Sequence, residues 1–201
     1  MANALPGLAR LLRLSGDFAS IETHQETLDL QRALVKKEPH NKELHETLAN
    51  GLVGFCETLR ANGDLDEALG PCQESVKILR ALVAEHSTNS AQQRLLSVAL
   101  ERVGVVQKQR ENFAEALAVF RETLDIAREL TAKDPENTQW RSDVASSLGY
   151  IGDVLQLQAD VSGAIAAYRE ALDVRRSLAV KDPRVEKTDV VAAGHVSLHW
   201  R

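Results

Sequence analysis

The chain has 201 residues, 44% of them hydrophobic and 26% charged, which is typical of a folded protein and excludes extended disorder. Its formal net charge is −5 and it contains no basic cluster, so we expect no nucleic-acid partner. No uninterrupted apolar stretch reaches the ~20 residues that span a membrane. We therefore expect no membrane partner and a cytoplasmic location.

One sequence pattern recurs every 48 residues. The segment 112–117 returns at 160–165, and one period earlier the same slot is 64–69. The Lys-Asp-Pro run that begins at Lys133 returns at Lys181. A fixed period of this size is typical of a solenoid, in which each repeat buries its apolar face by stacking on its neighbours.

Apolar residues spaced by three and four predict two helices in each repeat. Residues 5–12 fit the end of a first-type helix, so we expect the chain to begin inside a repeat. Asp64, Asn112 and Asp160 are expected to cap second helices. The predicted helices cover 18–37, 41–61, 65–86, 90–109, 113–133, 138–158 and 161–181, with a weaker one over 186–200.

Gly70-Pro71 lies inside the helix predicted for 65–86. Proline removes one backbone donor and crowds the preceding turn, so we expect a kink or a late helix start there.

These helices predict a single repeat domain over residues 1–201. Its parts are a partial repeat at 1–39, full repeats at 40–87, 88–135 and 136–183, and a cap or truncated repeat at 184–201.

Small and aromatic residues recur at fixed slots within the repeats. One set is Gly152, Ala164, Tyr168 and Ala171. The pattern resembles the tetratricopeptide repeat, in a long-helix variant similar to kinesin light chains and to bacterial arrays with long repeats. The resemblance implies an all-α, right-handed superhelical solenoid of antiparallel helix pairs. Two further sets fit, the second loosely: Gly104, Ala116, Phe120 and Thr123; Cys56, Ala68, Cys72 and Ser75.

No catalytic or metal-binding constellation is apparent. His45-Glu46 begins like a zinc-protease helix, but Ala49 stands where the second histidine belongs. His195 and His199 are four residues apart, without an evident third ligand. We expect no enzyme activity, no metal and no cofactor.

The two cysteines, Cys56 and Cys72, cannot form a disulfide framework or a paired zinc motif. We expect both to be small, buried, reduced side chains.

The resemblance implies that a partner peptide lies along the first helices, on the concave face of the solenoid. The alternative is an ordinary solvated face. Glu57, Glu101 and Asp153 give this face a weak preference for a basic partner. The candidate binding residues are Asn50, Glu57, Arg60, Glu101, Lys108, Ser146, Asp153 and Gln156.

The sequence thus predicts a protein-interaction scaffold or adaptor. The alternative function is a regulatory or sensor module of a larger signalling protein. Exposed apolar ends of a solenoid also favour self-association.

Overall fold

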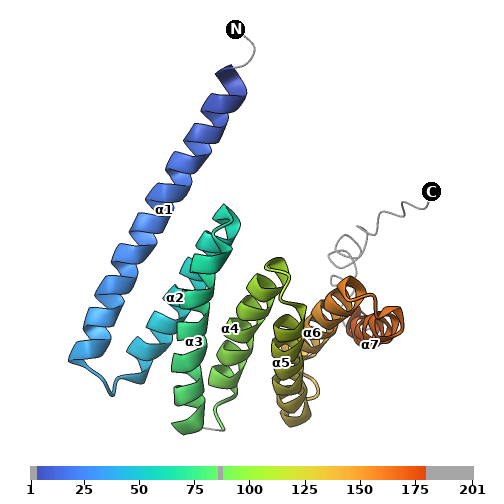
Figure 1. The fold of residues 1–201 in the computed structure, drawn as a ribbon. Coiled ribbons are helices and arrows are strands. Elements are labelled where there is room, and N and C mark those ends of the chain that lie inside the picture. Colours follow the sequence, from blue (N-terminus) through green and yellow to red (C-terminus); the bar gives the residue numbers. More distant parts are fainter. Residues whose placement is uncertain (1–3, 86–87, 180–201) are drawn as a thin grey trace. The chain divides into compact units, whose positions relative to one another are not determined.

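The computed structural model describes residues 4–85 and 88–179, with side chains from residue 21 onward. Within these ranges the chain forms seven α-helices and no strand (Figure 1). The helices are α1 (Ala4–Lys37), α2 (Lys42–Asn62), α3 (Leu65–Glu85), α4 (Ser90–Gln109), α5 (Phe113–Lys133), α6 (Thr138–Leu157) and α7 (Val161–Ala179).

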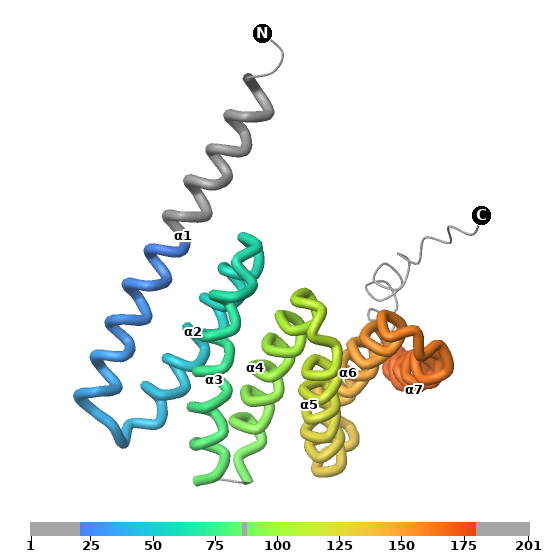
Figure 2. The backbone as a smooth tube through the Cα atoms, in the orientation of Figure 1, coloured from blue at the N-terminus to red at the C-terminus, as the bar shows by residue number. Residues whose placement is uncertain are grey.

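The chain divides into two compact units, Met1–Thr123 and Leu124–Arg201. In the first unit α1 packs on α2, α2 on α3 and α3 on α4, as the backbone trace in Figure 2 shows. In the second unit α6 packs on α7. Consecutive helices within each unit are antiparallel, so the all-α architecture of helix pairs is confirmed.

Helices α2 and α6 bury apolar residues at the predicted spacing of three and four. On α2 the predicted stripe residues Leu48, Leu52 and Phe55 are buried, and on α6 Val144 and Leu148 are buried. The predicted helix bounds differ from the observed ones by one residue or none between residues 41 and 158. The weak helix predicted for 186–200 and the end of the one predicted for 161–181 lie outside the described residues.

The start of the chain differs from expectation. The turn predicted between residues 12 and 18 is absent, because α1 runs without a break from Ala4 to Lys37. The sequence there is one residue shorter than the corresponding turn at Gly63, which needs a left-handed residue. Helical hydrogen bonding therefore continues through it and satisfies the backbone.

Pro71 does not delay the helix that contains it. Helix α3 begins at Leu65 and includes Pro71, so the late start is wrong. The turn at Asp64 already fixes this beginning, since the Asp64 carbonyl accepts from the Ala68 N–H at 2.9 Å. The helix therefore continues through Pro71, although proline has no backbone N–H to donate at that position.

The turns repeat as regularly as the helices. In each pair, one residue of the turn between the first and the second helix has a positive φ angle. The angle is 96° at Gly63 and 62° at both Glu111 and Ala159. Asp160 caps α7 as predicted, because its carboxylate accepts from the Gly163 N–H at 3.0 Å. The side chains of the other two predicted caps bond to groups outside the helix that follows them. Asp64 accepts from the Asn62 side-chain amide, and the Asn112 amide donates to the Gln107 side-chain oxygen. The first helices carry asparagine caps one period apart, at Asn41, Asn89 and Asn137.

Glycines allow the two helices of a pair to approach closely. A Cβ atom on Gly104 would lie 2.5 Å from Phe120 Cε1, and one on Gly152 would lie 2.6 Å from Tyr168 Cε1. Both contacts are far shorter than carbon atoms tolerate. The small residue and the facing ring are therefore steric partners.

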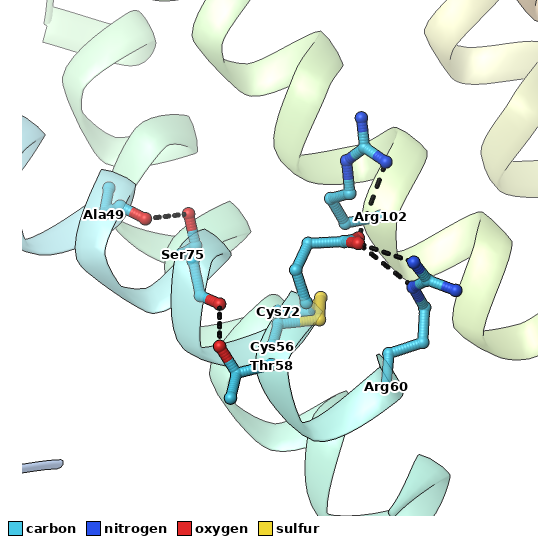
Figure 3. The surroundings of a disulfide bond; sticks show 9 residues. Ala49, Cys56, Thr58, Arg60, Cys72, Ser75 and Arg102 are labelled. Atoms are coloured by element: carbon cyan, nitrogen blue, oxygen red, sulfur yellow. Dashed lines mark hydrogen bonds and ion pairs between the residues drawn. A yellow bond between two sulfur atoms is a disulfide. The ribbon is translucent and has the colours of Figure 1, made fainter. Parts of the chain in front are cut away.

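The expectation of free cysteines is wrong. Cys56 and Cys72 form a disulfide that joins α2 to α3 (Figure 3). The helix pair brings the two Cα atoms to 5.5 Å, within the range that a disulfide needs. Both side chains are fully buried. They occupy the slots that Gly104 and Phe120 hold one period later, so a covalent bond replaces the glycine–aromatic contact.

Candidate partner-binding surface

The predicted face on the first unit is made by α2 and α4, the first helices of consecutive repeats. We call it the first-helix face. Asn50 is exposed, whereas the remaining positions are half-buried. The first-helix face is therefore partly accessible to solvent, and most of its side chains also pack against neighbouring residues. Its residues are Asn50, Val53, Glu57, Arg60, Val98, Glu101, Val105 and Lys108.

A network of ion pairs crosses this face. Arg60 contacts Glu57 at 2.8 Å within α2. Arg102, on α4, lies 3.5 Å from Glu57. Arg102 also lies 3.0 Å from Glu101. Figure 3 shows Arg60 and Arg102 on either side of one carboxylate. Two carboxylates thus share two guanidinium groups, and the network bridges the two first helices. The acidic character expected of this part of the face is neutralised.

Arg102 is a residue that the sequence interpretation missed. Its slot holds Gly54 one period earlier and Tyr150 one period later, so the repeat gives no signal there. Only the packing of α4 beside α2 reveals its contact with Glu57.

Between the charged groups, Val53, Val98 and Val105 present apolar surface. All three are half-buried. A surface that combines small apolar patches with fixed polar groups suits the alternating side chains of a bound peptide.

In the second unit, the predicted residues Ser146, Asp153 and Gln156 lie on α6. The Tyr168 hydroxyl donates to Asp153 at 2.8 Å and lies 3.2 Å from the Gln156 side-chain oxygen. Burial, together with the Asp153 carboxylate, raises the pKa of Tyr168. Asp153 and Gln156 are therefore held in place by a neighbouring ring.

Other kinds of site find little support in the described part of the chain. No group of three or more His, Cys, Asp or Glu side chains is placed to hold a metal there. None of the described helices is long and apolar enough to cross a membrane. The candidate pair His195 and His199 lies outside the described residues. An open hollow of about 500 Å³ at the turn before α3 includes Arg110, whose guanidinium pairs with Asp66 at 2.7 Å.

The antiparallel helix pairs, the recurring small and aromatic slots and the repeated turns define the class. The chain is a helical repeat protein that resembles the tetratricopeptide repeat. Residues 144–183 match the family model described as Tetratricopeptide repeat.

One of three similar solved structures has a TM-score above 0.5 and supports the helical repeat fold. BtubC (BKLC) from P. vanneervenii aligns with a TM-score of 0.61 at 15% identity, over 81% of this chain and 58% of that one. The chain thus spans somewhat more than half the length of BtubC. The designed helical repeat protein DHR64 aligns at 0.48 and 17% identity, over 90% of this chain and 91% of that one. MamA aligns at 0.28 and 12% identity, over 78% and 91%. No curated protein matches the chain.

Proposed function

We propose that this protein is an interaction scaffold that binds a partner polypeptide along the first-helix face. The observation that carries the proposal is the arrangement of α2 and α4. These helices present Val53, Val98 and Val105 around a neutral ion-pair network that stays half-exposed. Side chains used only for stacking would be buried between helices.

The charge of the face favours a partner different from the one that the sequence suggests. Glu57 and Glu101 already contact arginines within the chain, so a basic peptide would have to displace them. We propose a partner that inserts small apolar side chains beside the valines and hydrogen-bonds to Asn50. Association of this kind depends on shape more than on net charge.

The protein as a non-enzymatic scaffold is part of the same proposal. Helical repeats of this type serve as extended binding surfaces, and function has to come from the residues on them. The buried disulfide favours an oxidising compartment over the cytoplasmic location that the sequence predicts. Such bonds persist in oxidising surroundings and are rare in a reducing cytosol. A regulatory module of a larger signalling protein remains the alternative prediction.

The test is affinity capture with the full chain and with Val53→Arg/Val105→Arg. Both substitutions place a long charged side chain on the face while leaving the core and ion pairs intact. We expect loss of the captured partner with unchanged helicity by circular dichroism.

The matched control is Lys77→Glu, an exposed change on α3. It should leave capture unaltered. Equal capture by the face variant and by the parent would reject the first-helix face as the binding surface.

A further inference from the structure

The disulfide between Cys56 and Cys72 lies next to the ion-pair network of the first-helix face. Cys56 is followed in the chain by Glu57, whose carboxylate pairs with Arg60 at 2.8 Å and with Arg102 at 3.5 Å. Arg102 belongs to α4, so Glu57 bridges α2 and α4 across the face (Figure 3). The covalent bond and the centre of the network are therefore neighbours on one helix.

The helix pair that carries this part of the face differs from the other pairs. In those, the two cysteine slots hold a glycine and an aromatic ring, Gly104 with Phe120 and Gly152 with Tyr168. Contacts of that kind do not respond to oxidants or reductants. A bond between two cysteines is reversible. Among these three pairs, only the fit between α2 and α3 can therefore depend on redox state.

The space around the two sulfur atoms is full, since Cys56 and Cys72 are both completely buried. Two thiols that are not bonded to each other need more room than a disulfide does. Reduction therefore pushes the two side chains apart inside a packed interface. Packed interiors respond to such crowding with changed rotamers and small backbone shifts. We expect the part of α2 that contains Cys56 and Glu57 to shift relative to α3.

Anchors on both sides of the bond limit this shift. On one side, the Ser75 hydroxyl donates to the Ala49 carbonyl oxygen at 2.9 Å, and both residues are fully buried (Figure 3). On the other side, the turn at Gly63 joins α2 to α3. Neither anchor contains the disulfide. A reduced chain therefore keeps the helix pair and loosens it between the anchors, where Cys56 and Glu57 lie.

The contact between Glu57 and Arg102 is the one that this shift disturbs most. At 3.5 Å it is the longest ion pair of the network, compared with 2.8 Å for Arg60 and Glu57. Arg60 moves together with Glu57, because both belong to α2, whereas Arg102 belongs to α4. Reduction thus weakens the bridge between the two first helices. It also changes the spacing of Val53 from Val98, on which a bound peptide would depend.

We propose that the disulfide between Cys56 and Cys72 is a redox switch for the first-helix face. The oxidised chain binds its partner and the reduced chain binds it weakly, which rests on the proposed function of that face. In the reducing step a dithiol gives up two electrons and two protons, and the sulfur–sulfur bond breaks. Cys56 and Cys72 become thiols, while the dithiol closes to its own disulfide. Exchange with another disulfide compound reverses the step.

Hydrogen exchange measured by mass spectrometry tests the loosening without a partner. In the full chain, a dithiol should speed exchange of the α2 amides over residues 53–60 by at least about fivefold, the lower end of ordinary coupling between sites. Circular dichroism should show unchanged helicity, because the anchors remain. Loss of helicity in the dithiol would show that the bond holds the fold and not the face, and would overturn the proposal. Unchanged exchange would overturn it too.

Affinity capture with and without the dithiol tests the consequence for binding, with the partner that the oxidised parent captures as the probe. The parent should capture at least about fivefold less of it in the dithiol. Cys56→Gly/Cys72→Phe carries the glycine–aromatic contact of the next repeat and should capture equally in both conditions. Cys56→Ser/Cys72→Ser should capture little in both. Capture by the glycine–phenylalanine variant that still falls in the dithiol would overturn the proposal.

The face and the switch can fail separately. If Val53→Arg/Val105→Arg loses the partner while the parent captures it equally with and without the dithiol, the face binds and the switch is overturned. An oxidised parent that captures no partner would reject the proposed function and the switch together.

Discussion

Cys56 on α2 and Cys72 on α3 are joined by a disulfide in the slots where the next repeat places Gly104 against Phe120. Two different solutions therefore hold a first helix to its second helix. One repeat uses a covalent bond between small side chains, and the others use a ring packed on a glycine.

Removal of the disulfide should destabilise the first unit. The bond closes a segment with a sequence separation of 16, for which chain entropy predicts about 3 kcal/mol. Cys56→Ser/Cys72→Ser should lower the free energy of unfolding by about this amount in urea titrations. Added reductant should destabilise the parent and leave the serine variant unchanged. A parent indifferent to reductant under unfolding conditions would argue against the bond.

The repeat itself suggests a rescue. Cys56→Gly/Cys72→Phe introduces the pair that Gly104 and Phe120 form one period later. We expect this variant to be more stable than the double serine variant, because the ring fills the space between the helices and buries apolar area. Thermal unfolding of both variants in reductant measures the difference. A glycine–phenylalanine variant less stable than the serine variant would show that the two slots are not equivalent.

Gly104 and Gly152 should respond differently to alanine. Each added methyl would meet a ring, but Phe120 is fully buried whereas Tyr168 is partly exposed and can shift. Gly104→Ala should therefore cost about 1–3 kcal/mol, and Gly152→Ala less. Urea unfolding compares them. Equal costs would contradict the steric explanation.

The turn residues with positive φ allow stabilisation. Ala159 has φ 62°, a conformation that costs a non-glycine residue about 1 kcal/mol. Ala159→Gly should therefore raise the melting temperature. Gly63→Ala, at φ 96°, should lower it. A lower melting temperature for Ala159→Gly, or a higher one for Gly63→Ala, would refute this assignment of the turns.

Asp160 predicts a pH dependence. Hydrogen bonds from the Gly163 N–H, and then from the Ser162 hydroxyl, hold its pKa below the ordinary value of 3.8. A lowered folded-state pKa contributes stability above the unfolded-state pKa, and this is lost as the pH falls through the folded-state pKa. Asp160→Ala should therefore be less stable than the parent at neutral pH, and the difference should shrink below about pH 3.8.

Asp160→Asn is the matched control, since asparagine keeps a cap oxygen and does not titrate. Its stability relative to Asp160→Ala should not depend on pH in this range. A gap between parent and Asp160→Ala that stays constant down to pH 2 would contradict the role of the carboxylate.

The helices were predictable because the period aligns several copies of each slot, so that every apolar stripe is seen more than once. The missing turn in α1 was not, because a turn one residue shorter has no copy for comparison. The disulfide could have been anticipated from the facing slots of Gly104 and Phe120, but cysteine count and spacing alone conceal it. Arg102 occupies a slot that does not repeat, and its contact with Glu57 depends on how α4 packs beside α2.

Charged residues also follow the 48-residue period, because an arginine of one second helix pairs with a glutamate of the next in Arg32–Glu74, Arg80–Glu122 and Arg128–Glu170. Arg32, Arg80, Arg128 and Arg176 are one period apart. So are Glu26, Glu74, Glu122 and Glu170. Since each inner pair is partly exposed, it contributes little energy by itself, roughly 0–1 kcal/mol.

Site-specific photo-cross-linking tests the proposed function most directly. A photoreactive residue at Val105, on the first-helix face, should form a covalent product with the captured partner. The same residue at Lys77, on the exposed side of α3, should form none. Cross-linking from Lys77 but not from Val105 would contradict the account and place the partner on the second helices.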